Sequence, residues 1–595
     1  MSDRYTVALI ALLDVTLLSA QGALDVNQVR ALFHSNGMIS NQTPPGQPFF
    51  QVPAQPDSNG PSTLFAGSIW IGGMDANSTL HLAAERFGQE GNDFFPGPLG
   101  AGGTITQEQS DAYDRLWTVF RTDVLHHLEY FTCLNDPGCD VEQSFPNYAI
   151  PQVFLDWPAH GDQDAGQAAF LAPFVDFNGD GLYDPTAGDA PCVPGDQALF
   201  AIYNDRLATH TESGGAPIGV EVHMTPFAYS SADPAVAQTV FVRYRIHNRG
   251  GVALNDAYLG LFNDFDLGYS GDDHLQCDAS RNLMMVLNST NNDTGGGAPT
   301  YGAQPPAFGL MVLRGPRMDP DGADNADTIT PQGFNGMGFD DGTVDNERLG
   351  LAYCGAFGNA ALEPAMGDPG SPQEYYNYLR GIWRDDAVMT YGGNGYSTDP
   401  EAVPARFLFP GDSDPLGIGT GGIAMPPWTE AGSGNAPGDR RAIGSIGPFT
   451  FGPGAEQELL VAYIFARAGS GGPQASLEAL RVRADSIRAF ASTVHGLMDD
   501  TGSCADLLLG TGPASVVAEE IGLFPNPVHD QLTVRWPGRS NAAWCEVLDA
   551  HGSVVLRRNR SGAADVLDVG CLPAGPYLVR VHGEGRSRSA RFVKQ

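Results

Sequence analysis

Apolar and polar residues alternate along several stretches of the chain in the manner of β-strands with one buried face. Between residues 238 and 248 one face consists of Val240, Val242, Tyr244 and Ile246, and residues Arg243, Arg245 and His247 lie on the other. This period of two predicts a half-buried strand. Residues 459–465 are apolar at every position, which favours a central strand covered on both faces.

Further strands are predicted by shorter apolar runs, at 62–72, 79–84, 218–223 and 256–262. The Gly-Pro-Gly sequence at 452–454 predicts a turn, so we expect 449–451 and 457–466 to form a hairpin.

Two stretches have apolar residues at helical spacing instead. The first is 107–130, with Tyr113, Leu116, Trp117, Phe120, Val124 and Leu128. In the second, Ser476 is the expected N-cap, and the predicted buried face consists of Leu477, Leu480, Ala484, Ile487, Ala491 and Val494.

Strands thus outnumber helices, and 75 glycines and 44 prolines are typical of a protein with many turns. The sequence predicts a mainly β protein. Its body is expected to be a large β-sandwich-type domain with a few helices.

The C-terminal residues 519–595 have the pattern of a separate small domain. Phe524-Pro525-Asn526-Pro527 is a proline-locked extended entry. Six short strands with turn sequences between them follow, which is typical of a small Ig-like β-sandwich.

Four blocks of this region also carry a resemblance to a known family. FPNPVHDQLTV, VLDAHGSVVL, LDVGCLPAGPYLVRV and ARFVKQ resemble the type A C-terminal sorting domain of the type IX secretion system of Bacteroidetes-like bacteria. The resemblance implies two partners, an outer-membrane translocon and a sortase-like peptidase that removes the domain. It also implies release of the protein or its attachment to surface lipopolysaccharide. The alternative is an ordinary terminal Ig-like module without a sorting role.

The N-terminus fits an exported protein. Residues 1–20 combine Arg4, a short apolar run and Ser19-Ala20, which predicts a secretory signal peptide. No other stretch is apolar for long enough to cross a membrane. We therefore expect a signal peptide (1–20), a β-rich extracellular body (24–500), a linker (501–518) and a sorting domain (519–595). The expected location is the outer-membrane cell surface or the extracellular space, reached through the periplasm.

The charge of the chain limits its partners. The formal net charge is −37, and Lys594 is the only lysine. Such a surface repels phosphate backbones, so nucleic-acid binding is excluded as a function. Solubility explains most of the charge, although dense carboxylates also suit cations.

Eight cysteines in an exported chain are compatible with disulfides. Cys133 and Cys139 flank a turn sequence and are expected to pair, and a Cys545–Cys571 pair is expected in the terminal sandwich. The partners of the other four cannot be deduced, namely Cys192, Cys277, Cys354 and Cys504.

The loop 176–184 has the spacing of a calcium site. Oxygen-bearing side chains stand at positions 1, 3, 5 and 9, a glycine stands at position 6, and a carbonyl is available at position 7. The predicted Ca²⁺ ligands are Asp176, Asn178, Asp180, Asp184 and the carbonyl of Leu182. The loop resembles the repeats of dockerins and thrombospondin-type domains, because it lacks the glutamate at position 12 of an EF-hand. The alternative is a loop of Asx turns without metal.

Other acidic and aromatic runs of the sequence favour structural roles over functional ones. We expect a solvated loop to contain the acidic residues Asp264, Asp266, Asp272, Asp273 and Asp278. The second alternative for these residues is another cation site, and the third is a pair of catalytic carboxylates. The aromatic run 375–383 is expected in the core rather than stacked on a sugar. The chain contains no G-x-S-x-G, H-E-x-x-H, P-loop or dinucleotide motif.

Blocks of the body, including DFNGDGLYDP and DRRAIGSIGPFTFGPG, resemble large exported Bacteroidetes proteins of unknown activity. The first hypothesis is therefore a calcium-stabilised structural or adhesive module that contacts surface lipopolysaccharide or glycans. The alternative is a secreted hydrolase acting on polysaccharide.

Overall fold

The protein divides into two compact units, Met1–Gly510 and Thr511–Gln595. The computed structural model describes residues 20–40, 49–55, 60–87, 91–297, 299–326, 331–358, 364–494, 496–498, 504, 522–524, 528–535, 544–548, 554–559, 564–583 and 586–594. All but the last residue of the predicted signal peptide, and all of the predicted linker except residue 504, lie outside these residues.

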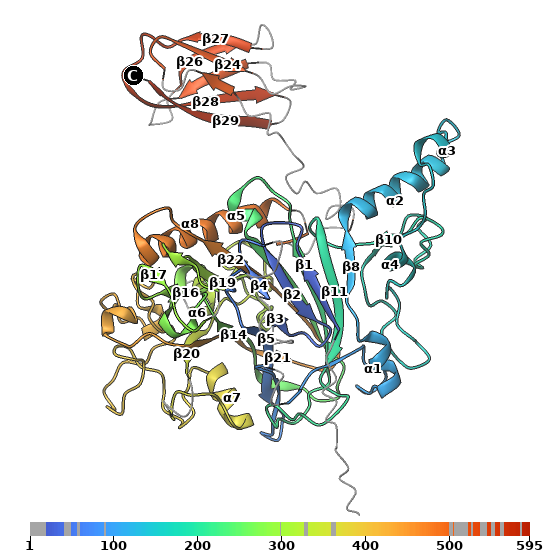
Figure 1. Ribbon diagram of the computed structural model, residues 1–595, viewed down its shortest axis with the longest axis vertical. Coiled ribbons are helices and arrows are strands. Elements are labelled where there is room, and N and C mark those ends of the chain that lie inside the picture. The colour runs from blue at the N-terminus through green and yellow to red at the C-terminus, as the bar shows by residue number, and fades with distance from the viewer. Residues whose placement is uncertain are drawn as a thin grey trace, which may run out of the picture. The chain divides into compact units, whose positions relative to one another are not determined.

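The first unit, here called the body, is built on two nine-stranded sheets whose paired strands all run antiparallel (Figure 1). The first sheet has the order β1 (Gln21–Leu24), β2 (Arg30–His34), β3 (Ile39–Ser40), β5 (Ala66–Met74), β14 (Leu254–Phe265), β21 (Arg440–Phe451) and β20 (Tyr353–Phe357), with β4 (Phe50–Gln51) beside β2 and β6 (Leu80–Ala84) beside β5.

The second sheet has the order β15 (Asp273–Asp278), β16 (Leu283–Asn288), β19 (Ala307–Arg314), β22 (Glu456–Ala466), β13 (Thr239–Asn248), β12 (Val220–Ala228), β11 (Gln197–Asn204) and β7 (Phe95–Pro96), with β8 (Trp117–Phe120) beside β11. The described part of the body also contains two small strand pairs, β9 (Phe174–Val175) with β10 (Ala190–Pro191) and β17 (Asn292–Asp293) with β18 (Gly302–Ala303).

Helices are few and mostly short. They are α1 (Gln107–Tyr113), α2 (Arg121–Leu134), α3 (Val141–Ser144), α4 (Gln152–Leu155), α5 (Pro234–Ala237), α6 (Pro331–Phe334), α7 (Pro372–Leu379), α8 (Gly472–Thr493) and the 3₁₀ turns η1 (Ser270–Asp272), η2 (Ala279–Arg281), η3 (Ile418–Thr420) and η4 (Ala431–Ser433). The predicted fold class, mainly β with a sandwich-type body, is confirmed.

The main core lies between the two sheets. Ile69 and Leu261 of the first sheet belong to the same buried cluster as Val242 and Val461 of the second. The strand at 239–248 shows the predicted alternation over 243–247, because Tyr244 and Ile246 are buried, as are Val240 and Val242, whereas residues 243, 245 and 247 are only half-buried. Burying these apolar side chains supplies the main driving force for the sandwich.

Helix α8 covers the outer face of the second sheet, over β16, β19 and β22 (Figure 1). The predicted face of this helix is confirmed, since Leu477, Leu480 and Ala484 are fully buried. The predicted N-cap is wrong. The helix begins at Gly472, one turn earlier, and the hydroxyl of Ser476 instead donates to the carbonyl of Pro305 (2.7 Å).

The single helix predicted over 107–130 is wrong in its middle. Helix α1 ends at Tyr113, and residues 117–120 form β8, which pairs with β11 before α2 begins at Arg121. Trp117 and Val119 alternate into the core of the outer face. Aromatic and β-branched residues fit a pleated surface, and over four residues helical and strand spacing cannot be told apart.

The hairpin predicted across 452–454 is also wrong. Strand β21 pairs with β14 and β20 in the first sheet, whereas β22 pairs with β13 and β19 in the second. The turn therefore carries the chain from one sheet to the other. The central position of β22 is confirmed, and it is flanked by a strand on each side.

Three disulfides are formed in the described residues. Cys133–Cys139 is confirmed, and the other two bridges are Cys192–Cys504 and Cys277–Cys354. The predicted Cys545–Cys571 bridge is wrong, because Cys571 is a free, exposed thiol whereas Cys545 is buried in the core of the C-terminal unit.

The second unit is a small sandwich with its own core. One sheet has the order β23 (Gly522–Phe524), β24 (Gln531–Arg535) and β27 (Ala564–Asp568), and the other has the order β26 (Val554–Asn559), β25 (Trp544–Leu548), β28 (Gly575–Gly583) and β29 (Arg586–Lys594). Val528, Leu532, Val547, Val579 and Phe592 are buried together between the sheets. The predicted small C-terminal sandwich is therefore confirmed.

The Cys277–Cys354 bridge joins β15 of the second sheet to β20 of the first. Replacing both cysteines with alanine should lower the free energy of unfolding of the body by about 2–4 kcal/mol, because the bridge restricts the unfolded chain. Denaturant unfolding of both proteins without reductant measures the difference. Cys571→Ser is the matched control and should leave the transition of the body unchanged. Equal midpoints for the double variant and the wild type would contradict a stabilising role.

Candidate metal centre

Three carboxylates and a guanidinium meet where β14 ends and β21 begins. The antiparallel register places Asp264 opposite Arg441, and Asp266 and Asp439 lie just beyond the paired residues. One oxygen from each of Asp264, Asp266 and Asp439 lies within 4.8 Å of the others. We call these three residues the carboxylate cluster.

The cluster runs from the interior to the surface. Asp264 is 4% exposed, Asp266 is half-buried and Asp439 is exposed. Arg441 donates to Asp439 (Nη2 to Oδ2, 3.0 Å), and its Nε lies 3.9 Å from Asp264 Oδ2. The other oxygen of Asp264, Oδ1, is buried without a hydrogen-bond partner among the described residues. A buried carboxylate oxygen left in this way is costly unless a proton or a cation satisfies it.

A second arginine lies close to the cluster. Arg86 and Arg441 both lie over the ring of Phe87, each 5.6 Å from its centroid. Asp368 lies between them, 3.4 Å from Arg86 Nη1 and 3.4 Å from Arg441 Nε. Arg86 is also bound by Glu212 at 2.8 Å, so it is not available to neutralise the carboxylate cluster.

The pKa values of the buried members reflect this arrangement. Burial raises the pKa of Asp264 well above its ordinary value, Asp266 adds to the increase, and Arg441 opposes it. Burial followed by the charge of Asp439 raises the pKa of Asp266 to about 7, again against Arg441. The site therefore favours a bound proton or cation over three free negative charges. Hard carboxylate oxygens are the ligands that Ca²⁺ and Mg²⁺ prefer.

The prediction that these acids lie in a solvated loop is wrong for three of them. Asp264, Asp273 and Asp278 are buried and belong to strands. Asp273 accepts from the backbone of Leu267, and Asp278 pairs with Arg281 (3.0 Å). Sequence reasoning also missed Asp439, because only the pairing of β14 with β21 brings it to Asp266.

The predicted calcium loop lies on the surface after β9. Asp176 accepts from Gly179 N (2.7 Å) and Gly181 N (2.8 Å), and Asn178 Nδ2 donates to Asp180 Oδ2 (2.9 Å). These three side chains therefore turn into the loop. Asp184 accepts from the backbone and hydroxyl of Thr186, and Leu182 is exposed. Binding of Ca²⁺ by this loop stays a prediction.

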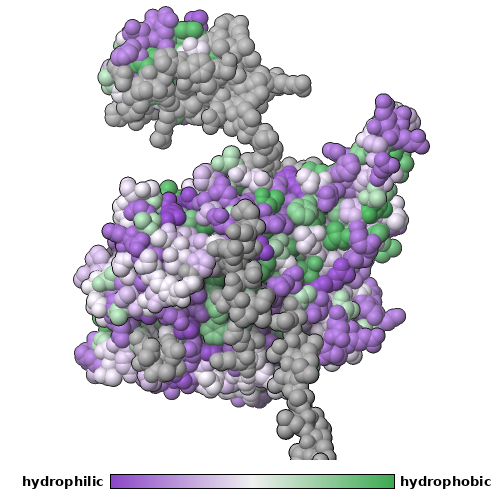
Figure 2. Space-filling model, viewed as in Figure 1, coloured by the Kyte–Doolittle hydropathy of each residue, from purple (hydrophilic) through white to green (hydrophobic). Residues whose placement is uncertain are grey.

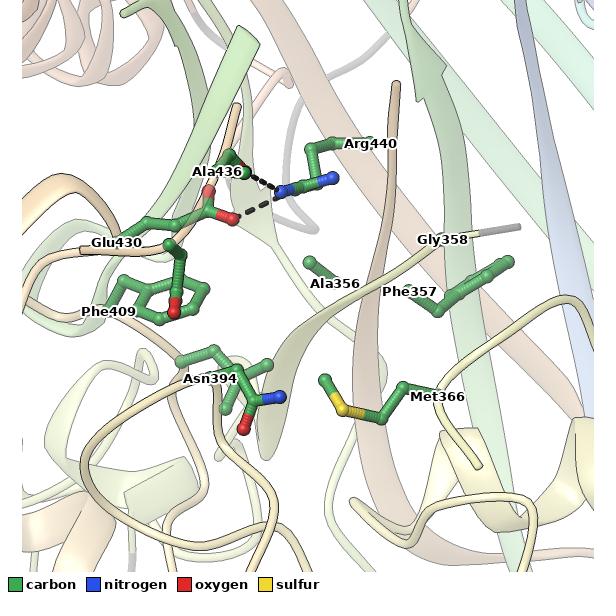
Figure 3. A pocket seen from close by; sticks show the side chains of 11 residues that line it. Ala356, Phe357, Gly358, Met366, Asn394, Phe409, Glu430, Ala436 and Arg440 are labelled. Carbon is green, nitrogen blue, oxygen red and sulfur yellow. Dashed lines mark hydrogen bonds and ion pairs between the residues drawn. The ribbon is translucent and has the colours of Figure 1, made fainter. Parts of the chain in front are cut away.

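A small pocket opens between β20 and the loops that precede β21 (Figure 3). Glu430 and Arg440 point toward each other across it and pair at 2.8 Å, and Glu430 also accepts from Leu275 N. Its volume is about 140 Å³, room for a few water molecules. The lining residues are Ala356, Phe357, Gly358, Met366, Asn394, Leu408, Phe409, Glu430, Asn435, Ala436 and Arg440.

The aromatic run after residue 374 is part of the core, as predicted. Tyr375, Tyr376 and Tyr378 of α7 and Trp383 are at most 1% exposed. They pack on the outer face of the first sheet and do not form a platform for a sugar.

Residues 522–595 match the family described as the secretion system C-terminal sorting domain, Por_Secre_tail. This confirms the predicted sorting domain. The protein is a secreted cargo of the type IX system and carries its export signal in the C-terminal unit.

No curated protein sequence matches the chain. Among solved structures, the chain is similar to a polysaccharide lyase at 8% identity and a TM-score of 0.18, over 67% of this chain and 35% of the lyase. It is also similar to PorZ, described as an essential bacterial surface component of the type IX secretion system of Porphyromonas gingivalis. That similarity has 10% identity and a TM-score of 0.12, over 73% of this chain and 48% of PorZ. The chain thus spans half or less of either protein, and neither similarity carries a functional argument.

The raised pKa of Asp266 predicts how the stability of the body depends on pH in the presence of chelator. The folded protein keeps the proton of Asp266 up to about pH 7, whereas the unfolded chain loses it near pH 4. The contribution of Asp266 to the free energy of unfolding is therefore fully present below about pH 4 and is lost as the pH rises through about 7. Asp266→Asn should therefore unfold less readily than the wild type near pH 8, by about 1 kcal/mol, and similarly near pH 4.

Unfolding of both proteins in denaturant at a series of pH values measures this difference. Asp164→Asn, at an exposed loop position, is the control and should follow the wild-type profile. The same pH profile for Asp266→Asn and the wild type would show that Asp266 does not hold the proton.

Proposed function

We propose that the protein passes through the periplasm by means of a signal peptide at 1–20. In this proposal the type IX translocon exports it, and the body then acts at the cell surface or in the surrounding medium as a structural or adhesive module stabilised by calcium. The match of residues 522–595 to a sorting domain is the observation that carries the export part. None of the helices in the described part of the chain combines the length and apolar character needed to cross a membrane.

A sortase-like peptidase and surface lipopolysaccharide or glycans complete the proposed set of partners. The two units have separate buried cores. A cut in the chain between the units would therefore remove the C-terminal unit and leave the core of the body intact. The Cys192–Cys504 bridge is compatible with removal of the C-terminal unit, because a cut after residue 504 leaves the crosslinked body whole.

The surface of the body supports an adhesive role over a catalytic one. Purple hydrophilic residues predominate over the face seen in Figure 2, with green apolar patches on the part built from α2 and α4. Several large apolar side chains of this part are at least 38% exposed, namely Phe120, Leu134, Leu155, Phe170 and Leu182.

The alternative of a polysaccharide hydrolase requires two accessible carboxylates beside an aromatic cleft. Asp264 is buried, and the pocket of about 140 Å³ holds a glutamate already paired with Arg440. Neither of these two arrangements accommodates a sugar chain.

Deleting residues 519–595 should abolish export to the surface while leaving the body folded. In the source bacterium, cell fractionation with immunoblotting should find the truncated chain in the periplasm and the full chain at the surface or in the medium. Thermal melting of the purified truncated chain should reproduce the transition of the body and serves as the control for folding. A truncated chain that still reaches the surface would refute the sorting role.

Calcium binding by the loop 176–184 predicts that a chelator lowers the melting temperature of the body by a few degrees, because an ion that binds only the folded state stabilises it. Asp176→Ala removes the central acceptor of the loop, and in protein freed of metal and reloaded with calcium alone it should melt at the same temperature with and without chelator. Asp164→Ala, at an exposed loop position, should keep the wild-type shift. A chelator effect that persists in Asp176→Ala would show that any bound calcium lies elsewhere.

A further inference from the structure

Two histidines and a glutamate come together on one face of the second sheet. In the pairing of β12 with β13, Glu221 lies opposite His247, and His223 lies two residues along β12 on the same face as Glu221. One potential ligand atom from each of the three lies within 4.8 Å of the others. We call these residues the His–His–Glu triad.

The triad is shielded from water. Glu221 is 0% exposed and His223 is 3% exposed, while His247 is half-buried. The backbone N–H of Leu99 donates to Glu221 Oε2 at 2.7 Å, and the ring of Phe200 lies 6.0 Å from that of His223. A ligand held here would be surrounded by protein on several sides.

Two ring nitrogens of the triad lack partners. His223 Nε2 lies 2.9 Å from Glu221 Oε1, but His223 Nδ1 has no hydrogen-bond partner among the described residues, and neither has His247 Nε2. The two rings face each other with centroids 4.8 Å apart. Two buried imidazole nitrogens without partners, beside a buried carboxylate, are an arrangement that a metal ion would satisfy.

The second ring nitrogen of His247 lies beside a carboxylate, as is typical of histidines that bind a metal. His247 Nδ1 is 3.4 Å from Glu456 Oε2. A carboxylate at this position fixes the ring and its tautomer, so that the proton stays on Nδ1 and the lone pair of Nε2 is available to a metal.

Charged side chains surround the triad. Arg249 lies 3.2 Å from Glu221 Oε1, and Arg245 pairs with Glu456 (3.0 Å) and lies 3.6 Å from Glu458. Glu458 is bound more closely by Arg314 (2.9 Å), so Glu221 and Glu456 are balanced by Arg249 and Arg245. Arg249 competes for Glu221, but its side chain is 28% exposed and reaches solvent without crossing the core.

We propose that Glu221, His223 and His247 form a binding site for a transition-metal ion, with zinc the best fit. Two imidazoles and one carboxylate are a common zinc ligand set, whereas calcium takes oxygen ligands. Zinc–ligand bonds of about 2.0–2.2 Å require donors roughly 3.3 Å apart, so ligand atoms that lie within 4.8 Å of one another need to approach by at most about 1.5 Å. The bound ion ties β12 to β13 under the segment that contains Leu99. This site depends neither on the calcium loop nor on the sorting role.

Zinc titration of the purified full-length protein, first freed of metal with chelator, tests the site. Isothermal titration should show one zinc bound per chain at this site, and His223→Gln and His247→Gln should each weaken that binding at least tenfold. His126→Gln is the matched control, because His126 is an exposed histidine on α2, and it should bind as the wild type does. Added calcium should not compete.

Two further measurements keep the test decisive if a buried variant fails to fold. Glu456 is 38% exposed in its side chain, so Glu456→Gln should fold and should weaken zinc binding by about tenfold through loss of the orienting carboxylate. Cobalt bound to the unaltered protein should show the visible d–d absorption of a four-coordinate site with nitrogen ligands. Absence of zinc binding by the wild type, no d–d absorption, or wild-type affinity in folded His247→Gln would each overturn the proposal.

Discussion

The contact between the inner faces of the two nine-stranded sheets is the interaction on which the rest of the body depends. It joins strands from almost the whole length of the unit, from β2 near residue 30 to β22 near residue 460. The hydroxyl of Tyr463 crosses this core and donates to Asn263 Oδ1 at 3.0 Å. Once this layer is formed, the two outer faces remain to be covered, and α8 and α7 cover them. The carboxylate cluster and the His–His–Glu triad lie at the periphery of this arrangement.

The acidic composition places a second constraint on the fold. The body buries many carboxylates although the chain has few basic residues, and Lys594 lies in the other unit. Backbone N–H groups stabilise some of these buried carboxylates, since Asp205 accepts from Ile218, Gly219 and Val220. Arginine side chains stabilise most of the other buried carboxylates. The planar fork of an arginine contacts several carboxylates at once, which the point charge of a lysine does less well. In the carboxylate cluster, Arg441 alone does not balance the three carboxylates.

Patterns that depend on neighbouring residues were readable from the sequence. The alternation at 240–246 and the helical face from Leu477 to Ala491 were predicted correctly, because each strand or helix presents one stripe to one surface. The sorting domain was readable for a related reason, since its turns and strands lie close together in the chain. The Cys133–Cys139 bridge likewise closes a short turn.

Features that depend on distant partners were not readable. The stretch around Trp117 fits both a helix and a strand, and only the exposed edge of β11 decides between them. The turn at 452–454 is compatible with a hairpin, but β21 and β22 each pair with strands that no local pattern identifies. Asp439 and His247 joined their clusters only through sheet register.

The Cys192–Cys504 bridge has a mechanical consequence for a protein moved by its tail. Helix α8 ends at Thr493, so without a crosslink any pull on the C-terminus would act directly on that helix and peel it from the sheet. The bridge fastens the chain at residue 504 to Cys192, which is buried next to β10. Tension applied from the tail therefore passes into the body at that covalent anchor, and the helix that protects the apolar face bears none of it.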